Sequence, residues 1–242
     1  MEVTLSDLPL ITLLARIRRA ILMSLGFIIV LGALCWFFTD SILAYLFAMY
    51  TDVDGFVFTH VSESFFVKLK LAAACGFTLS IPLILWQLRS VVAPFISLQN
   101  RSLSYAFIPF ASLLFYSGLT FAVWAILPLA VRFFLGFDNA GVEPLLRLES
   151  IVNFSISLAL PMAIVFQLPL VIYFLARLGV LSATMLRNAR KYSILGIVII
   201  SAILTPADVF SQIMMAIPLV VLYEISIWLA HVAQRGRQSE QR

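Results

Sequence analysis

Six runs of apolar residues, separated by short polar segments, constrain this chain more than any other feature. A helix needs roughly 20 consecutive apolar residues to cross the hydrocarbon core of a bilayer. With 62% of its residues hydrophobic and only 12% charged, against about 45–50% and about 25% in soluble domains, the chain could not bury its apolar surface in a soluble fold. The sequence therefore predicts an all-α polytopic membrane protein, with one integral membrane domain over residues 1–242 and six transmembrane helices at about residues 20–38, 69–88, 105–127, 151–176, 192–204 and 212–233.

The fifth run is too short to cross a bilayer of ordinary thickness. Residues 192–204 form a helix of about 20 Å, whereas the hydrocarbon core is about 30 Å thick. We expect this span to be shielded by protein or surrounded by thinned bilayer. Among the prolines within the runs, four are expected to bend their helices, because proline removes a backbone donor. These are Pro82, Pro161, Pro169 and Pro218, and they favour a concave bundle over a straight one.

Charged residues sort by side of the membrane. Twelve of the sixteen Lys and Arg residues lie in the N-terminal segment, in the loops after the second and fourth runs, and in the C-terminal tail. Eight of the twelve acids lie on the opposite side, most of them in two long loops at about residues 39–68 and 128–150. Because basic loops stay in the cytoplasm, both termini are predicted to be cytoplasmic. Residues 1–19 are expected to form a cytoplasmic amphipathic helix and residues 234–242 a cytoplasmic tail.

The residue types that catalyse reactions or bind metals are few and scattered. His60 and His231 fall on opposite sides of the predicted membrane, and there is no phosphate loop or Gly-x-Ser-x-Gly elbow. We therefore expect no enzyme, no catalytic or metal-binding residues, no cofactor and no nucleic-acid partner. Cys35 and Cys75 fall inside apolar runs, where a bridge is geometrically possible but two small buried core residues are favoured.

One acid falls inside a predicted span. Glu224 lies near the middle of the sixth run, where an ionised carboxylate costs roughly 2.5–3.5 kcal/mol on insertion scales. It must therefore face protein or water, or stay protonated. We favour a functional role for Glu224, as a docking or proton-linked site. Gln167, near the middle of the fourth run, is interpreted as a hydrogen-bonding contact between helices.

The stretch LTPADVFSQIMMAIPLVVLYE, from Leu204 to Glu224, resembles the signature of the TatC family of twin-arginine protein translocases. FYSGLTFAVWAILP in the third run and PLITLLARIRRAIL near the N-terminus resemble the same family. FTHVSESFFVKLKLA resembles its outer-loop motif, with Glu63, Phe65, Phe66 and Lys70 in place. The resemblance covers about residues 8–232, which is nearly the whole chain.

The resemblance implies a cupped, receptor-like bundle of six helices with short fifth and sixth spans, integral to the bacterial cytoplasmic (inner) membrane. It implies a core receptor subunit that recognises the paired arginines of signal peptides and moves folded proteins by the proton motive force, without ATP. The implied partners are small single-span translocase subunits of the A/B type, the signal peptides of folded cargo, other copies of the chain and the lipid bilayer. The small subunits are implied to dock along the last two spans, at Pro206, Asp208, Gln212 and Glu224.

The chain departs from the family at positions implied to bind signal peptides. The family carries glutamates where this chain has Arg16 and Asn100, which neighbour Arg18 and Arg101, and a third where it has Gln167. Charge-assisted arginine–carboxylate pairs are strong, whereas like charges about 4 Å apart repel by roughly 1–4 kcal/mol. Two functions therefore stay open: a translocase core subunit, and a divergent paralogue that binds the small subunits but has lost signal-peptide recognition. A proton-coupled small-solute transporter, suggested only by Glu224, is a weaker third.

Overall fold

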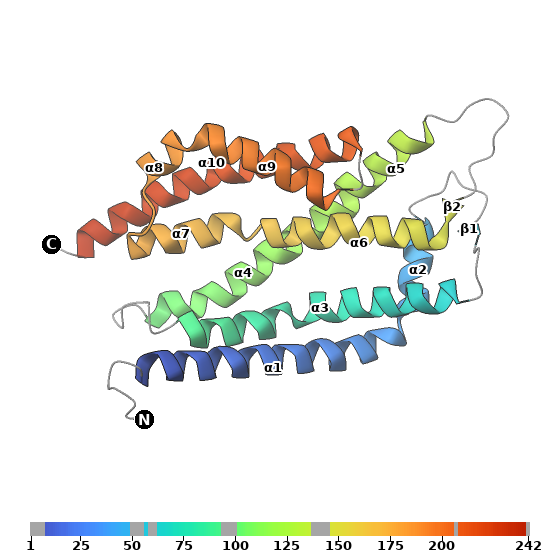
Figure 1. The fold of residues 1–242 in the computed structure, drawn as a ribbon, viewed down its shortest axis with the longest axis horizontal. Helices are drawn as coiled ribbons and strands as arrows, with labels where there is room; N and C mark the ends of the chain where they lie inside the picture. Colours follow the sequence, from blue (N-terminus) through green and yellow to red (C-terminus); the bar gives the residue numbers. More distant parts are fainter. Residues whose placement is uncertain are drawn as a thin grey trace, which may run out of the picture. The chain divides into compact units, whose positions relative to one another are not determined.

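The computed structural model describes the backbone of residues 8–48, 56–57, 62–92, 101–136, 146–205 and 208–240 (Figure 1). Apart from two strands of two residues each, the regular structure of this part is helical, which confirms the all-α class. The helices are α1 Leu8–Trp36, α2 Thr39–Ala48, α3 Glu63–Val92, α4 Arg101–Phe121, η3 Ala122–Ile126, α5 Leu127–Leu135, α6 Leu148–Val165, α7 Leu168–Leu178, α8 Ala183–Asn188, α9 Arg190–Leu204 and α10 Val209–Glu240. The strands are β1 Phe56–Val57 and β2 Leu146–Arg147.

Five helical segments of the described chain are long and apolar enough to cross a membrane. They coincide with the first, second, third, fourth and sixth apolar runs and cover Leu14–Trp36, Glu63–Leu88, Phe107–Leu135, Leu148–Arg177 and Val209–Arg235. The fifth run lies in α9, which has 15 residues and a length of about 22 Å. Of the two spans expected to be short, only this one is a short helix. α10 has 32 residues because it continues past the apolar run through the polar residues that follow it.

The first helix is continuous through the expected start of the first span. α1 runs without interruption from Leu8 to Trp36, through the predicted boundary between residues 19 and 20. Pro9 lies in its first turn, where the missing N–H has no intrahelical acceptor to lose, and no further proline follows to break the helix. The cytoplasmic location of residues 1–19 stays a prediction.

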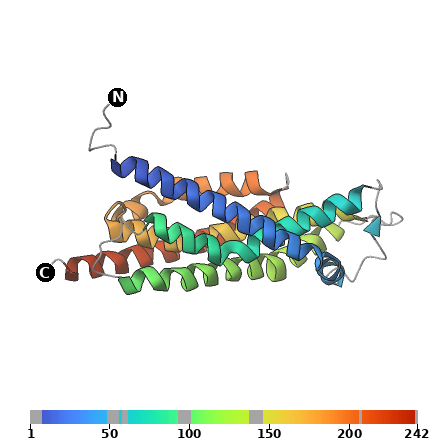
Figure 2. The ribbon, with the colours of Figure 1, turned by 90° about the horizontal axis from the view of Figure 1, so that it is seen from below.

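The chain divides into two compact units, residues 1–44 with 68–112 and residues 45–67 with 113–242. In the first unit, α1 and α3 run side by side in opposite directions and cross at an angle (Figures 1 and 2). They touch where two glycines meet, because a Cβ atom built on Gly76 would lie only 2.5 Å from the Cα of Gly32. Both Cys35 and Cys75 are free thiols; Cys35 is buried, as the core-residue interpretation expected, whereas Cys75 is only half-buried.

Prolines interrupt two spans of the second unit. The third span passes through the π-helical turn η3, where the N–H of Leu127 bonds to the carbonyl of Ala122 directly before Pro128. Pro128 and Pro169 lack the N–H that continues an α-helix. The fourth span is accordingly divided into α6 and α7 by a turn at Phe166 and Gln167, just before Pro169.

The core of the second unit is built around the last helix. α10 packs along α7 and α9, and Met162 of α6 and Met215 of α10 are fully buried. The ring of Phe133, near the end of α5, stacks on Phe210, at the start of α10, with centroids 3.4 Å apart. The ring of Phe166 lies against Gly118, where a side chain would meet it at 2.6 Å. Position 118 of the third span must therefore be glycine, because it faces the turn that divides the fourth span into α6 and α7.

Candidate functional site

Glu63, the acid of the motif expected in an outer loop, lies at the N-termini of two helices. It is the first residue of α3, and only 1% of its side chain is exposed. Its Oε1 accepts a hydrogen bond at 3.2 Å from the backbone N–H of Glu149, in the first turn of α6. Its Oε2 lies 3.6 Å from Nη2 of Arg147. Helix N-termini carry unpaired N–H groups and partial positive charge. The carboxylate of Glu63 therefore stabilises the N-termini of both α3 and α6.

A short parallel strand pair supports the same junction. Phe56 pairs with Leu146 and Val57 with Arg147, so the two loops predicted on the outer side are joined by backbone hydrogen bonds. Phe65 and Phe66 follow Glu63 on α3, and their rings meet edge to face at 5.7 Å while about half of each side chain is exposed. The motif therefore combines one buried acid with exposed aromatic rings, and Lys70 is also exposed.

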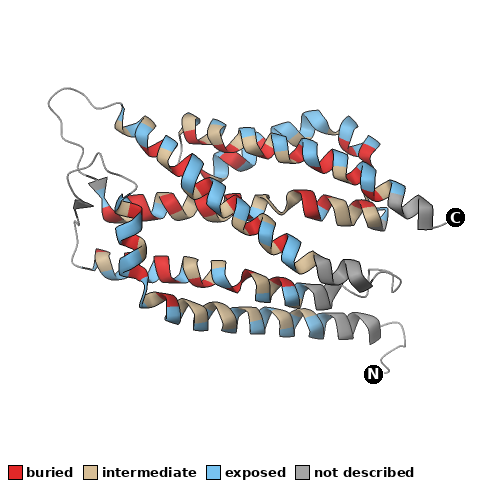
Figure 3. Ribbon diagram, turned by 180° about the vertical axis from the view of Figure 1, so that it is seen from behind, coloured by how far each residue is buried: buried red, intermediate tan, exposed pale blue. Residues whose placement is uncertain are grey.

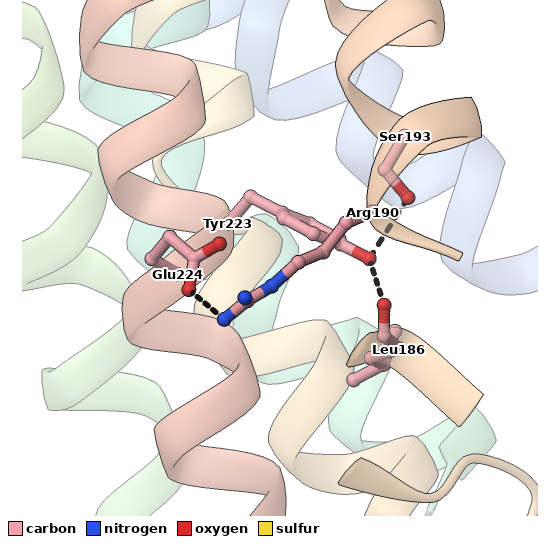
Figure 4. Close-up of polar contacts among 5 residues, drawn as sticks. All are labelled: Leu186, Arg190, Ser193, Tyr223 and Glu224. Carbon is pink, nitrogen blue, oxygen red and sulfur yellow. Dashed lines mark hydrogen bonds and ion pairs between the residues drawn. The ribbon is translucent and has the colours of Figure 1, made fainter. Parts of the chain in front are cut away.

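Glu224 belongs to a polar cluster formed by α8, α9 and α10 (Figure 4). Its Oε2 lies 2.7 Å from Nη2 of Arg190, and just under half of each side chain is exposed. The neighbouring Tyr223 is buried. Its hydroxyl donates to the backbone carbonyl of Leu186 at 2.8 Å and accepts from the hydroxyl of Ser193 at 2.9 Å. The cluster ties the start of α9 to both of its neighbouring helices.

Arg190 changes the interpretation of Glu224. It is the first residue of α9, so Glu224 lies level with the end of the short helix and not halfway along it. Of the environments expected for Glu224, the structure shows a contact with protein, namely an ion pair with Arg190. Sequence reasoning missed Arg190, Ser193 and Tyr223. Antiparallel pairing of the last two runs, with their connection at residues 205–208, would have brought the start of α9 toward this part of α10.

We predict that the ion pair can be inverted. Glu224→Arg sets two guanidinium groups against each other and should destabilise the protein by about 1–4 kcal/mol, whereas Glu224→Gln should cost at most about 1 kcal/mol because the pair is half exposed. Adding Arg190→Glu to Glu224→Arg should restore most of the lost stability. The measurement is a double-mutant cycle on the thermal unfolding midpoint of the purified full chain in detergent. Strictly additive effects would contradict a direct interaction.

Two of the expected docking residues hold the turn between α9 and α10. Oδ1 of Asp208 accepts a hydrogen bond at 2.6 Å from the N–H of Ser211, as an N-cap residue does. Nε2 of Gln212 donates to the carbonyl of Val198 in α9 at 3.1 Å. Gln212 and Glu224 are twelve residues apart on α10, about 18 Å along the helix, so the structure does not bring them together. Pro206 lies outside the described residues.

Gln167 lies in the turn that divides the fourth span. Its backbone N–H bonds to the carbonyl of Ile164 at 3.0 Å, and its carbonyl accepts from the N–H of Val171 at 3.0 Å. The backbone of Gln167 therefore helps to connect α6 to α7. The predicted side-chain contact between helices stays a prediction.

The positions implied to recognise signal peptides are only partly described. Arg16, Arg18 and Arg19 are exposed on α1. Asn100 lies outside the described residues, and of Arg101 the structure gives the backbone at the start of α4. Among the described residues, no group of three His, Cys, Asp or Glu side chains could hold a metal ion.

Comparisons with known proteins agree over most of the chain. The family model described as Sec-independent protein translocase protein (TatC) matches residues 12–218. A Carboxydothermus hydrogenoformans protein named Sec-independent protein translocase protein TatC is 36% identical over 219 residues, 90% of each chain. An Escherichia coli protein of the same name is 31% identical, covering 96% of this chain and 92% of its own. A crystal structure described as the twin arginine translocase receptor TatC matches with a TM-score of 0.83 at 31% identity, over 91% of this chain and 99% of that one.

Proposed function

Because this chain belongs to the TatC family of Sec-independent protein translocase proteins, we propose that it is the receptor subunit that moves folded proteins with twin-arginine signal peptides across the bacterial cytoplasmic membrane. It is a membrane protein of the twin-arginine translocase, a transport protein. The proton motive force drives the transport. The observation that carries the proposal is the match of 91% of the chain, at a TM-score of 0.83, to a solved receptor of this kind.

We propose six membrane crossings in a single membrane domain, with α9 as the fifth. With only the five long spans, the two termini would lie on opposite sides of the membrane. Both termini carry basic residues, with Arg16, Arg18 and Arg19 at one end and Arg235 and Arg237 at the other. The positive-inside rule therefore requires an even number of crossings, and α9 supplies the sixth in spite of its length. Residues 1–19 and 234–242 then lie in the cytoplasm.

We propose that single-span partner subunits dock along α9 and α10, with other copies of the chain and the lipids as further neighbours. Apolar residues recur every four positions along α10 and stay exposed, at Val209, Ile213, Ile217, Val221 and Ile225. Much of α9 is exposed as well (Figure 3), and its exposed residues are largely apolar. A partner helix would cover this surface and shield the short α9. The residues expected to dock the partner would then mainly maintain the shape of this surface and contribute less to direct contact with the partner. They are Pro206, Asp208, Gln212 and Glu224.

A specific observation favours the second candidate, a paralogue that binds partner subunits but not twin-arginine signals. Arg16 is exposed beside Arg18 and Arg19, and α1 contains no Asp or Glu between Leu8 and Trp36. Such a surface repels a pair of arginines. The transporter alternative is weaker, because its one supporting residue, Glu224, is paired with Arg190.

Export of a folded reporter tests the proposed function. The host would lack its own TatC protein, keep its small subunits and express this chain. We expect export with a twin-arginine signal and at least tenfold less with a lysine–lysine signal. Arg16→Glu with Asn100→Glu should raise the affinity for the signal peptide about tenfold or more, because it replaces repulsion with attraction.

The same experiment separates the two candidates. No export, with normal membrane levels and co-purification of the small subunits, would contradict the first candidate and support the paralogue. Rescue by the double glutamate variant would then assign the defect to Arg16 and Asn100. Co-purification serves as the control, because it reports assembly without signal recognition.

A further inference from the structure

We propose that the groove between α1 and α3 binds one acyl chain of an anionic phospholipid, whose phosphate is held by the arginines of α1. The groove has a volume of about 380 Å³. Its walls are almost entirely aliphatic, with Ile17, Ile21 and Ile28 from α1 and Ile84 and Leu88 from α3. This site is separate from the α9–α10 surface, and it does not depend on the function proposed above.

The groove follows from how the two helices cross. α1 and α3 are in backbone contact at Gly32 and Gly76, whereas the groove lies between the N-terminal half of α1 and the C-terminal part of α3. Figure 2 shows the helices crossing at an angle, so contact at one level opens a gap at another. Ile21 and Leu25 line the groove and are still 62% and 52% exposed. The groove is therefore open along its length to the surrounding lipid.

The dimensions of the groove fit an acyl chain. From Ile17 to Ile28 it follows twelve residues of α1, whose end-to-end rise is about 16 Å. That length is about half of a hydrocarbon core of about 30 Å, the share of a single leaflet. A transmembrane helix is about 10 Å wide, so a segment of this length would fill more than about 1,000 Å³, well above the volume of the groove. A lipid chain therefore fits better than a partner helix.

The charge at one end of the groove selects the headgroup. Arg16, Arg18 and Arg19 are exposed in the same turn of α1 as Ile17, where the groove begins. The guanidinium fork binds phosphate oxygens with two hydrogen bonds, and basic pockets between membrane helices bind anionic lipid headgroups. Two polar residues, Ser24 and Gln87, also line the groove. A zwitterionic lipid has the same acyl chain, but its headgroup carries an added positive charge beside the phosphate that the arginines bind.

Lipid binding to the full chain, purified and stripped of lipid in detergent, tests this site. Native mass spectrometry would compare phosphatidylglycerol with phosphatidylcholine of the same acyl chains. We expect phosphatidylglycerol to bind at least tenfold more tightly. Ala20→Trp fills the groove and should weaken both lipids about tenfold or more, whereas Leu22→Trp, an exposed position of α1 outside the lining, should weaken neither.

A second variant separates the headgroup from the chain. Arg16→Gln with Arg18→Gln and Arg19→Gln changes only exposed residues, so it remains informative if Ala20→Trp does not fold. It should lower phosphatidylglycerol binding to the level of phosphatidylcholine and leave the latter unchanged. Equal binding of the two lipids to the unmodified chain would overturn the proposal, as would equal effects of Ala20→Trp and Leu22→Trp. A dimer lost in Ala20→Trp but kept in Leu22→Trp would also overturn it, because the occupant would then be a second copy of the chain.

Discussion

Replacing Gly76 with alanine is expected to lower the free energy of unfolding by about 1–3 kcal/mol, the usual cost of overpacking a tight contact. The added Cβ would lie 2.5 Å from the Cα and N atoms of Gly32 and 2.9 Å from the carbonyl oxygen of Ile28. All three are backbone atoms, so no side-chain rotation can relieve the overlap, and α1 must move away from α3. Close approach through small residues is a main source of helix association in membranes.

Two glycines of α1 provide matched controls for Gly76→Ala. Gly26 meets nothing within 4 Å, so Gly26→Ala should leave stability unchanged or raise it by up to about 1 kcal/mol through helix propensity. At Gly32 an added Cβ would make only an ordinary contact, 3.5 Å from the carbonyl oxygen of Ala72. Thermal unfolding of the purified chain would measure all three variants. Equal midpoints for Gly76→Ala and Gly26→Ala would contradict the close crossing of α1 and α3.

Replacing Glu63 with alanine is expected to destabilise the protein by about 1–3 kcal/mol, the cost of leaving a buried hydrogen-bonding group unpaired. The N–H of Glu149 loses its acceptor, and Arg147 loses one of its two acidic neighbours. Glu63→Gln should cost less, because the amide oxygen can still accept from Glu149 while the charge is lost. Faster hydrogen exchange at the amide of Glu149 would report the lost bond directly.

A surface ion pair of the first unit serves as the control for Glu63. Lys68 and Asp40 lie 2.6 Å apart, but 76% of the Asp40 side chain is exposed. Asp40→Asn should therefore change stability by no more than about 1 kcal/mol. If Glu63→Ala and Asp40→Asn had equal effects, or if exchange at Glu149 stayed slow in Glu63→Ala, the capping role would be wrong.

Much of the helical fold could be predicted from the sequence, because hydropathy and proline positions are local properties. The first, second, third, fourth and sixth apolar runs all lie in helices long enough to cross a membrane, and α9 is short as its run indicated. Pro169 indicated a bend, and the chain turns directly before it. The expected boundary after residue 19, between a cytoplasmic segment and the first span, stays a prediction, because α1 is one continuous helix through it.

The partners of the polar residues could not be predicted, because they depend on which helices lie side by side. Arg190 and Glu224 are 34 residues apart in the sequence, and only the pairing of α9 with α10 brings them together. Asp208 caps the start of α10 and Gln212 bonds to Val198 of α9, and their expected role in docking a partner stays a prediction. The family resemblance singled out Glu63, but its role required the junction of two loops that no local pattern connects.

The bond between Glu63 and Glu149 also has a consequence for biosynthesis. Its two residues are 86 positions apart, so at about 5–20 residues per second the ribosome needs roughly 4–17 s to supply the second after the first. During that time Glu63 has no helix N-terminus to cap except its own and must remain hydrated, while the intervening spans enter the bilayer. Closing so long a loop is slow compared with local helix formation. This junction therefore cannot form until Glu149 has been synthesised, and a nascent chain arrested before Glu149 would hold its second span in the membrane without it.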